Sequence, residues 1–422
     1  MAKIFVEAYG CSASSADSEM ISGMIQNGGH TLVQSASKSD LNVIVTCSVK
    51  DATANKMIHR IKSLRSKPLV VAGCLSKAEP ETVKKFAQDA SMMGPNSIGK
   101  TLQIVDSTLA GKKQIELEDT DLSKVGLPKV RLNDTVGIIE IASGCMSECT
   151  FCQTKLAKGG LKSYRPGDIA RQVRSEIDDG CKEIWLTSTD NGCYGLDIGA
   201  DLPELISTVT GVSGEFMVRI GMMNPMYMPR ISNRLLDSFE SDKVFRFLHV
   251  PVQSGSNKIL HEMSRGHTAE TFLDIVKRAR NRFGRFTIST DVIVGFPTET
   301  EEDYIETARL LDETRPDVVN LSRYSPRPGT ISAEWDQLDK KVIKRRSKEL
   351  HEQIRKITLD CNKKWIGWKG SVLFDERTDD GIRGRNAAYK PVFVRQEAEI
   401  GATLMVEITG ATPNSLLGEI AS

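Results

Sequence analysis

The feature that most constrains this chain is a run of three cysteines, Cys145, Cys149 and Cys152, spaced C-x₃-C-x₂-C. The run follows an apolar segment at residues 136–141, so it stands at the end of a predicted strand. A structural zinc site normally takes four protein ligands, and no fourth cysteine or histidine lies nearby. An iron–sulfur cluster held by three thiolates keeps one iron open to a small molecule. The spacing therefore favours a catalytic cluster, with a structural cluster or a zinc knuckle as the alternative.

Three further cysteines, Cys11, Cys47 and Cys74, occupy equivalent positions in the first hundred residues. Each follows a short apolar run that is typical of a buried strand, at residues 4–6, 43–45 and 69–72. Helix-like segments separate these runs, which predicts a small parallel sheet. Because the carboxyl ends of parallel strands share one edge, the three thiols are expected to converge there. The alternative is three buried cysteines that act as small apolar side chains.

Composition limits where such a protein works and what it binds. Its nine cysteines occur in a chain whose N-terminus shows no signal-peptide pattern, so disulfides explain them poorly. No apolar run approaches the roughly 20 residues of a membrane helix. We therefore expect a cytoplasmic protein with no membrane partner. The 422 residues suffice for two or three domains, and the net charge of +1 excludes a globally basic nucleic-acid binder.

The rest of the chain divides into a second βα series and a small all-β end. Residues 106–135 are charged and lack clear periodicity, so they are interpreted as a linker. Strand-like runs then alternate with helical segments, at residues 136–141, 183–187, 216–222, 245–252, 286–294 and 317–324. Six strands with intervening helices predict an open or partial (βα)₆ barrel. From residue 371 the chain is richer in valine, glycine and turn residues, which predicts a small β module.

A strongly basic segment precedes this β module. Residues 340–370 carry a net charge of +8, whereas residues 371–422 sum to −3. Cations bind phosphate and aromatic rings stack on unpaired bases, and here lysines alternate with Trp365 and Trp368. The segment is a candidate RNA-binding surface, with a solvated helix face beside core tryptophans as the alternative. The predicted RNA contacts are Lys344, Arg345, Arg346, Lys348, Lys363, Lys364 and Lys369.

Together these motifs resemble the radical S-adenosylmethionine (SAM) methylthiotransferase family. The triplet, with Phe151 before its last cysteine, is similar to the radical SAM signature, and the surroundings of Cys11, Cys47 and Cys74 resemble the family's N-terminal domain. Similar motifs also occur at residues 248–256, 291–300 and 324–330, and residues 381–386 and 416–419 resemble a TRAM module, a small RNA-binding β-barrel. Residues 186–195 and 219–225 are most similar to the archaeal and eukaryotic branch, which acts on N6-threonylcarbamoyladenosine in tRNA.

The resemblance implies an α/β protein of three domains. Residues 1–108 would form a flavodoxin-like methylthiotransferase N-terminal domain that carries an auxiliary cluster. Residues 131–357 would form the radical SAM core, a partial (βα)₆ barrel. Residues 358–422 would form the TRAM β-barrel.

The resemblance also implies the chemistry. Two 4Fe-4S clusters are expected, a SAM-binding one on Cys145, Cys149 and Cys152, and an auxiliary one on Cys11, Cys47 and Cys74 that carries sulfur. One SAM would give a 5′-deoxyadenosyl radical and another a methyl group, converting N6-threonylcarbamoyladenosine next to the anticodon into its 2-methylthio derivative. An electron donor of unknown identity is required. Candidate SAM contacts are Phe151, Asp190, Gln253 and Ser254, each of which is alternatively a cap or turn residue.

Two other functions stay open at this point: methylthiolation of a ribosomal-protein aspartate, and non-catalytic RNA binding by an iron–sulfur protein. The first would not need the tRNA-branch motifs or the basic segment, and the second predicts a full ligand set on each cluster. The chain departs from the family pattern at Ser14, Val45, Ser147, Glu148 and Lys158, the last replacing a usual arginine. None of these is a ligand position. The side chains of Cys181, Cys193, His249 and Cys361 are interpreted as packing residues.

Overall fold

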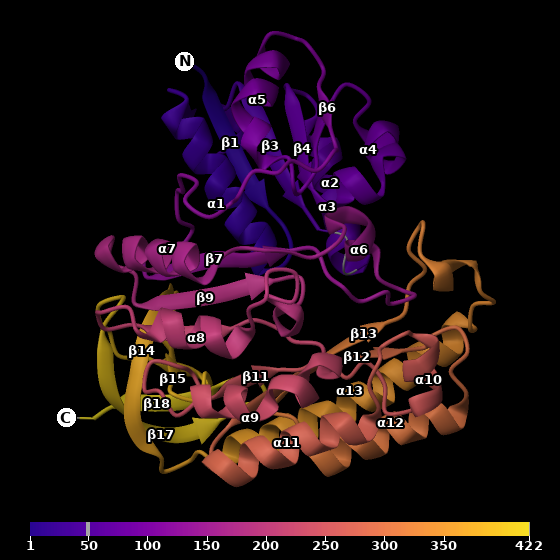
Figure 1. The fold of residues 1–422 in the computed structure, drawn as a ribbon, viewed down its shortest axis with the longest axis vertical. Helices are drawn as coiled ribbons and strands as arrows, with labels where there is room; N and C mark the ends of the chain where they lie inside the picture. Colours follow the sequence, from indigo (N-terminus) through magenta and orange to yellow (C-terminus); the bar gives the residue numbers. More distant parts are fainter. Residues whose placement is uncertain (48–50, 422) are drawn as a thin grey trace.

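The computed structural model describes residues 1–47 and 51–421. Figure 1 shows an N-terminal α/β part that lies over a second, larger βα part, with a β-barrel against one side of the latter. Within the described residues, no helix is both long enough and apolar enough to cross a membrane. The longest helix, α13 (Lys340–Lys363), is rich in charged residues.

The N-terminal part is built on a six-stranded parallel sheet with the order β2-β1-β3-β4-β5-β6. Its strands are β1 (Lys3–Ala8), β2 (Thr31–Leu32), β3 (Leu41–Thr46), β4 (Leu69–Gly73), β5 (Ser91–Met93) and β6 (Ile115–Glu116). Its helices are α1 (Ser12–Asn27), α2 (Asp51–Leu64), α3 (Cys74–Ala78), α4 (Pro80–Phe86) and α5 (Thr101–Leu109), with short turns η1 (Ala36–Lys38) and η2 (Ile98–Lys100). The predicted parallel sheet is therefore confirmed.

The central strands of this sheet have the composition that burial on both faces requires. Every residue of β3 and β4 is buried, as expected for apolar runs in a parallel sheet covered by helices. The expected linker at residues 106–135 is wrong in part, because β6 lies within it and pairs with β5. Two residues of strand, one of them charged, are too short for a periodicity to reveal.

The second part is an open barrel of six parallel strands, in two hydrogen-bonded groups, β10-β9-β7-β8 and β11-β12-β13. The strands are β7 (Val136–Ser143), β9 (Glu183–Ser188), β10 (Met217–Ile220), β11 (Phe247–His249), β12 (Thr287–Val294) and β13 (Val318–Arg323), with β8 (Lys162–Ser163) antiparallel to β7. A single bridge between Val218 and Val244 links the two groups. All six strands fall within the predicted runs or overlap them, and the partial barrel is confirmed.

Helices cover the outer face of this barrel. They are α6 (Gln153–Lys158), α7 (Pro166–Asp178), α8 (Leu202–Thr210), α9 (Met228–Ser238), α10 (Asn257–Glu262), α11 (Ala269–Phe283) and α12 (Glu301–Thr314), with short turns η3 (Asn191–Cys193), η4 (Pro225–Tyr227) and η5 (Ile331–Glu334). On α11, Phe272, Ile275, Val276 and Ala279 recur at helical spacing and enter the main hydrophobic core. Apolar residues on one stripe thus place each helix against the sheet.

The C-terminal part is a closed five-stranded barrel with the order β14-β15-β16-β18-β17. Its strands are β14 (Lys369–Thr378), β15 (Gly381–Asn386), β16 (Pro391–Val394), β17 (Thr403–Ala411) and β18 (Leu416–Ile420). Closure removes exposed strand edges, and alternate residues of β15 and β16 fill the interior. Helix α13 runs through residues 357 and 358, where the sequence suggested a domain boundary, and continues to the last turn before the barrel.

Candidate active site

The first cysteine triplet stands on one edge of the N-terminal sheet. Cys11 lies between β1 and α1, Cys47 follows β3, and Cys74 begins α3 at the end of β4. Because β1, β3 and β4 are neighbours in a parallel sheet, the three residues meet at its carboxyl edge. The backbone is shaped for this approach: Gly10 has φ of +132°, and a Cβ there would lie 2.5 Å from Cys47 Cβ.

These three thiols are in different electrostatic environments. A hydrogen bond with Cys47 holds the pKa of the Cys11 thiol well below its usual value. Burial raises the pKa of Cys74 to about 12. Cys47 and Cys74 are buried, whereas Cys11 is exposed. The structure thus brings Cys11 and Cys47 within hydrogen-bond distance of each other, with Cys11 close enough to Cys74 for its charge to raise the pKa of the Cys74 thiol.

The second triplet lies on the loop between β7 and α6. Cys145 follows Gly144 at the end of β7, and its backbone N–H donates to the carbonyl of Gly159 at 3.3 Å. Cys152 is the N-cap of α6, and its N–H donates to the Cys149 carbonyl at 3.1 Å. Burial and the neighbouring Cys149 raise the pKa of Cys152. The short loop therefore gathers all three cysteines beyond one strand end.

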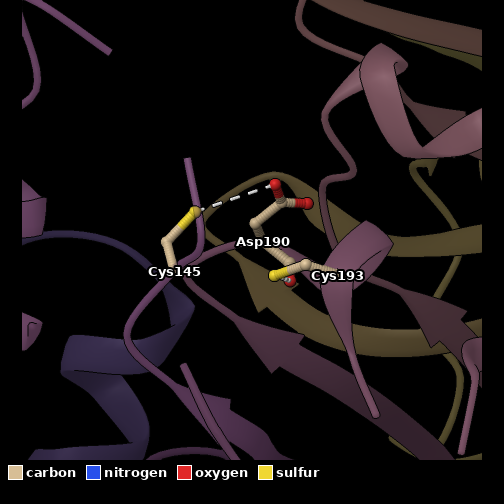
Figure 2. A group of neighbouring side chains, drawn as sticks. All are labelled: Cys145, Asp190 and Cys193. Carbon is tan, nitrogen blue, oxygen red and sulfur yellow. Dashed lines mark hydrogen bonds between the residues drawn. The ribbon is translucent and has the colours of Figure 1, made fainter. Parts of the chain in front are cut away.

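Cys145 also contacts two residues from the turn after β9, as Figure 2 shows. One ligand atom of each of Cys145, Asp190 and Cys193 lies within 4.8 Å of the other two, and all three residues are buried. A hydrogen bond with Cys193 lowers the pKa of the Cys145 thiol to about 7 and raises that of Cys193. Cys193, interpreted from the sequence as a packing residue, is therefore a direct neighbour of the triplet.

Arg265 is a charged neighbour that sequence reasoning missed. The side chain is buried, its Nη1 lies 3.4 Å from Cys149 Sγ, and its Nη2 donates to the Pro251 carbonyl at 2.9 Å. Beside it, burial lowers the pKa of His267 to about 4, so this ring is neutral at pH 7. Arg265 thus supplies a fixed positive charge to the triplet. It stands 113 residues after Cys152 in an ordinary helix–loop segment, and nothing in its local sequence signals this contact.

The elements that carry the two triplets contact each other across the boundary between the N-terminal part and the barrel. Helix α3, which begins at Cys74, packs against α6, which begins directly after Cys152. Figure 1 shows these two helices side by side beneath the N-terminal sheet. Ser12, next to Cys11, shares a 2.7 Å hydrogen bond with Thr187 of β9. Segments far apart in the sequence therefore bring the supports of the two triplets together.

A cavity of about 530 Å³ opens beside the second triplet, at the carboxyl ends of β12 and β13. Phe151 and Cys152 form one wall, and Gln253, Asp291 and Arg323 line the other side. The volume is typical of a small-molecule or cofactor pocket. Its lining combines apolar rings with a few charged and amide groups, which suits a ligand that is part aromatic and part charged.

The four residues predicted to contact SAM lie in different surroundings. Phe151 and Gln253 line the cavity, and Gln253 has φ of +72° with a buried Oε1 that lacks a hydrogen-bond partner. Asp190 lies at Cys145, but its Oδ1 accepts hydrogen bonds from the backbone of Gly192 and Asn224. Ser254 is fully buried and bonded to Thr307 at 3.2 Å, away from the cavity lining. The environment of Ser254 is thus that of a buried turn residue with a side-chain partner of its own.

The residues predicted to contact RNA differ in exposure and in ion pairing. Lys344, Lys348, Lys363 and Lys364 are exposed on and after α13. Lys369 is exposed at the start of β14 and pairs with Glu407 at 2.9 Å. Arg345 pairs with Glu301 at 2.7 Å while remaining exposed.

Arg346 is buried in ion pairs, which differs from the exposed RNA contact predicted for it. Its side chain is 4% exposed and is bound to Glu299 at 2.7 Å and to Glu301 at 3.0 Å. It therefore holds α13 against the start of α12 and cannot reach RNA. Trp365 is likewise buried in the barrel core, as the alternative interpretation had it.

The family of this chain follows from its similarity to known proteins. Residues 139–311 match the radical SAM superfamily, and residues 3–94 match a family described as uncharacterized protein family UPF0004. A protein of Pyrococcus horikoshii, named probable threonylcarbamoyladenosine tRNA methylthiotransferase, is 40% identical over the whole of both chains. This chain belongs to that family of radical SAM enzymes. The resemblance drawn from the motifs is confirmed.

Other relatives agree over most of their length. A Drosophila melanogaster protein named threonylcarbamoyladenosine tRNA methylthiotransferase is 35% identical, with 99% of this chain and 77% of that protein covered. Among solved structures, the radical SAM methyltransferase TsrM of Kitasatospora setae, with cobalamin and a [4Fe-4S] cluster bound, superposes with a TM-score of 0.58. The match covers 78% of this chain and 77% of TsrM at 12% identity, which speaks for the fold alone.

The residues present fit the 4Fe-4S cluster and SAM that the radical SAM family implies. Cys145, Cys149 and Cys152 offer three thiols at one strand end, with the guanidinium of Arg265 to balance thiolate charge. Gln253 lines the adjoining cavity, and its buried Oε1 has no hydrogen-bond partner, as expected of a group that a ligand would satisfy. The donor set and the cavity therefore suit a cluster with a chelating small molecule beside it.

Proposed function

We propose that this enzyme methylthiolates N6-threonylcarbamoyladenosine next to the anticodon of tRNA, giving the 2-methylthio derivative, with two 4Fe-4S clusters and SAM. The observation that carries the proposal is that two three-cysteine groups lie across one domain boundary, beside a cavity of about 530 Å³. A non-catalytic cluster protein has no need for two such groups to face each other. The names of relatives covering the whole chain support tRNA as the substrate.

The chemistry explains why two sites are needed. The hydrogen on carbon 2 of the adenine is too weakly acidic for side-chain base catalysis, which works on protons of accessible pKa. Bound SAM and the cluster would supply a carbon radical, able to abstract that hydrogen. Sulfur then has to arrive from a donor held nearby. We assign that role to Cys11, Cys47 and Cys74, because α3, which begins at Cys74, packs against α6, which follows Cys152.

The protein's own part is to place the reactants and to exclude water. Phe151 would present its ring and backbone to the SAM adenine, and Gln253 would accept a hydrogen bond from the ribose or amino group. Asp190 would keep the loop after β9 closed over Cys145, through its bonds to Gly192 and Asn224. Arg265 would fix Cys149 and balance its charge.

Substrate RNA would be held by the exposed lysines of α13 and the barrel. Lys344, Lys348, Lys363 and Lys364 carry unburied charges, and Arg345 and Lys369 lie near them in surface ion pairs that an RNA phosphate could replace. The reaction also requires a one-electron donor of low potential. We propose that it takes place in the cytoplasm, where six reduced thiols persist.

The test is anaerobic reconstitution with iron and sulfide, followed by mass spectrometry of tRNA. The enzyme would receive SAM, a chemical reductant and threonylcarbamoylated tRNA. We expect a mass increment of one methylthio group on that adenosine. Intact clusters without any increment would overturn the proposal. An increment on a ribosomal-protein aspartate instead would select the protein-modifying alternative.

Two variants divide the roles of the triplets. Cys149→Ala should abolish formation of 5′-deoxyadenosine, because it removes a ligand of the SAM-binding cluster. Cys47→Ala should leave SAM cleavage at least partly intact and stop sulfur insertion. Wild-type behaviour of both variants would show that the ligand assignment is wrong. SAM cleavage absent from the wild type, with both clusters loaded, would favour the non-catalytic alternative.

A further inference from the structure

Four buried charged side chains lie between the two cysteine triplets. The ammonium of Lys124 lies 2.7 Å from a carboxylate oxygen of Asp17 and 2.7 Å from one of Glu140. Lys158 lies 2.6 Å from the other oxygen of Glu140. None of the four side chains is more than 6% exposed. We call Asp17, Lys124, Glu140 and Lys158 the buried charge cluster.

Three members of this cluster stand on segments that present cysteines. Asp17 is on α1, which begins immediately after Cys11. Glu140 is on β7, which leads to Cys145, and Lys158 ends α6, which begins immediately after Cys152. The buried charge cluster therefore connects both triplets through their own supporting elements.

Stability alone does not account for such a cluster. Two charges taken out of water lose several kcal/mol of solvation each, and apolar residues of similar volume are often at least as stable. Within the cluster, two lysines balance two carboxylates. Thiolates at Cys11, Cys47 and Cys74 would add negative charge beside it, and of the four side chains Lys158 exerts the strongest attraction on both Cys11 and Cys74.

The backbone of Lys158 is tied to the radical SAM loop as well. Its carbonyl accepts a hydrogen bond from Asn96 Nδ2 at 3.2 Å, and Asn96 Oδ1 accepts one from Ser143 at 2.7 Å. The next carbonyl, that of Gly159, accepts the N–H of Cys145. Helix α6, which ends at Lys158, packs against α3, which begins at Cys74. Lys158 therefore stands where the supports of the two triplets meet.

We propose that Lys158 is a positioning residue for the auxiliary iron–sulfur cluster: its buried ammonium fixes a positive charge beside Cys11 and Cys74 and favours the reduced state of that cluster. The inference rests on the proposed assignment of the auxiliary cluster to Cys11, Cys47 and Cys74. A cluster gains negative charge on reduction, so a nearby cation raises its reduction potential. Lys124, equally buried but facing the two carboxylates, has the smaller effect.

The test is a redox titration followed by electron paramagnetic resonance, in full-length protein that carries Cys149→Ala and Cys152→Ala. That background leaves only the auxiliary cluster. Lys158→Met is expected to lower the ratio of reduced to oxidised cluster at least tenfold at a fixed potential, a shift of about 59 mV for one electron. Lys158→Arg should restore the ratio, and the matched control Lys124→Met should change it less than threefold.

Folding failure is separated from the charge effect by a balanced variant. Lys158→Met combined with Glu140→Gln removes one charge of each sign, so no carboxylate is left unpaired. In this variant the ratio of reduced to oxidised cluster at the same fixed potential should still fall at least threefold. An unchanged ratio in both Lys158 variants, with iron and sulfide content intact, overturns the inference. Absence of iron from the Cys149→Ala, Cys152→Ala background itself overturns the auxiliary-cluster assignment, and the inference with it.

Discussion

At the scale of single residues, the radical SAM loop depends on one glycine. Gly144 has φ of +72°, a conformation that L side chains rarely adopt, and a Cβ there would overlap the carbonyl oxygen of Gly160. The next residue, Cys145, donates its backbone N–H to the carbonyl of Gly159, where residues 144–145 and 159–160 meet. The direction in which Cys145 leaves β7 therefore requires glycine.

Gly144→Ala is expected to remove iron from the radical SAM site and spare the auxiliary site. The added methyl group would push residues 144–145 away from residues 159–160, and so would move the first ligand. Reconstituted Gly144→Ala should bind about half the wild-type iron. Gly160→Ala is the control, since a Cβ there meets nothing within 4 Å, and it should bind the full amount. Equal iron in both variants would contradict this account.

Another residue, Glu183 at the start of β9, makes stability depend on pH. Burial raises its pKa from 4.5 to about 7. Between these values the folded protein keeps a proton that the unfolded chain has lost, so stability falls as the pH rises. Glu183→Gln should therefore stabilise the protein by up to about 3 kcal/mol at pH 8. Urea unfolding at pH 8 and below pH 4.5 checks this, because the gain should vanish at the lower pH.

Single residues also show how far sequence reasoning reaches. Both triplets could be predicted, because cysteines at strand ends and in a short motif are local signals. Cys193 and Arg265 could not, since their contacts depend on how the β9 turn and the loop after α10 fold back onto the triplet. The burial of Ser254 and Arg346 could not be predicted for the same reason, because residue type alone does not determine burial.

At the scale of elements, helix α13 combines a buried face with a basic exposed face. Leu350, Ile354 and Ile357 pack into the main core, while Lys344 and Lys348 are exposed. Arg346 belongs to the buried face, because it pairs with Glu299, whose side chain is 1% exposed. The charge of Arg346 therefore stabilises the fold, whereas the lysine charges are exposed and available to bind RNA phosphates.

Substitutions on α13 should separate these two roles. Arg346→Met leaves Glu299 buried beside fewer cations, so we expect a loss of about 3 kcal/mol or more in the free energy of unfolding. Lys344→Ala with Lys348→Ala should leave stability within about 0.5 kcal/mol. The double variant should instead weaken tRNA binding and reduce its salt dependence by about two counterions. Filter binding across a salt series gives the slope, and an unchanged slope would exclude this face from the RNA contact.

Elements were predicted best where burial is uniform. β3 and β4 are mainly apolar and buried throughout, and their predicted positions are close to the observed ones. β11 is three residues long within a predicted run of eight, because Val250 and Val252 continue as an irregular edge that leads to the left-handed Gln253. Apolar patterns show which residues are buried, and backbone pairing then decides how many of them form a strand.

At the scale of the whole molecule, the C-terminal barrel closes one end of the larger barrel. Tyr389 packs edge-on against Phe245, with ring centroids 4.8 Å apart, and beside Phe247 at 5.0 Å. Lys390 is buried and lies 2.8 Å from Asp317, next to β13. It also donates to Asn362 of α13 at 2.7 Å. The C-terminal barrel is therefore fixed in position relative to the larger barrel.

Lys390→Met should loosen this attachment without unfolding the N-terminal part. Asp317 would keep the Arg280 guanidinium at 3.3 Å and the backbone N–H of Ile288 at 3.0 Å, both on one carboxylate oxygen. A buried carboxylate that loses one of its cations costs about 3 kcal/mol. Amide hydrogen exchange is expected to speed up in β15, β16 and α13, and to stay unchanged in β1, β3 and β4. Uniform acceleration across the chain would show that the three parts unfold as one unit.

The placement of the auxiliary cysteines also constrains how the enzyme is assembled in the cell. Cys47 and Cys74 are buried, whereas Cys11 is exposed. If the three hold the auxiliary cluster as proposed, iron and sulfide would enter past Cys11, the one thiol of the three that solvent reaches.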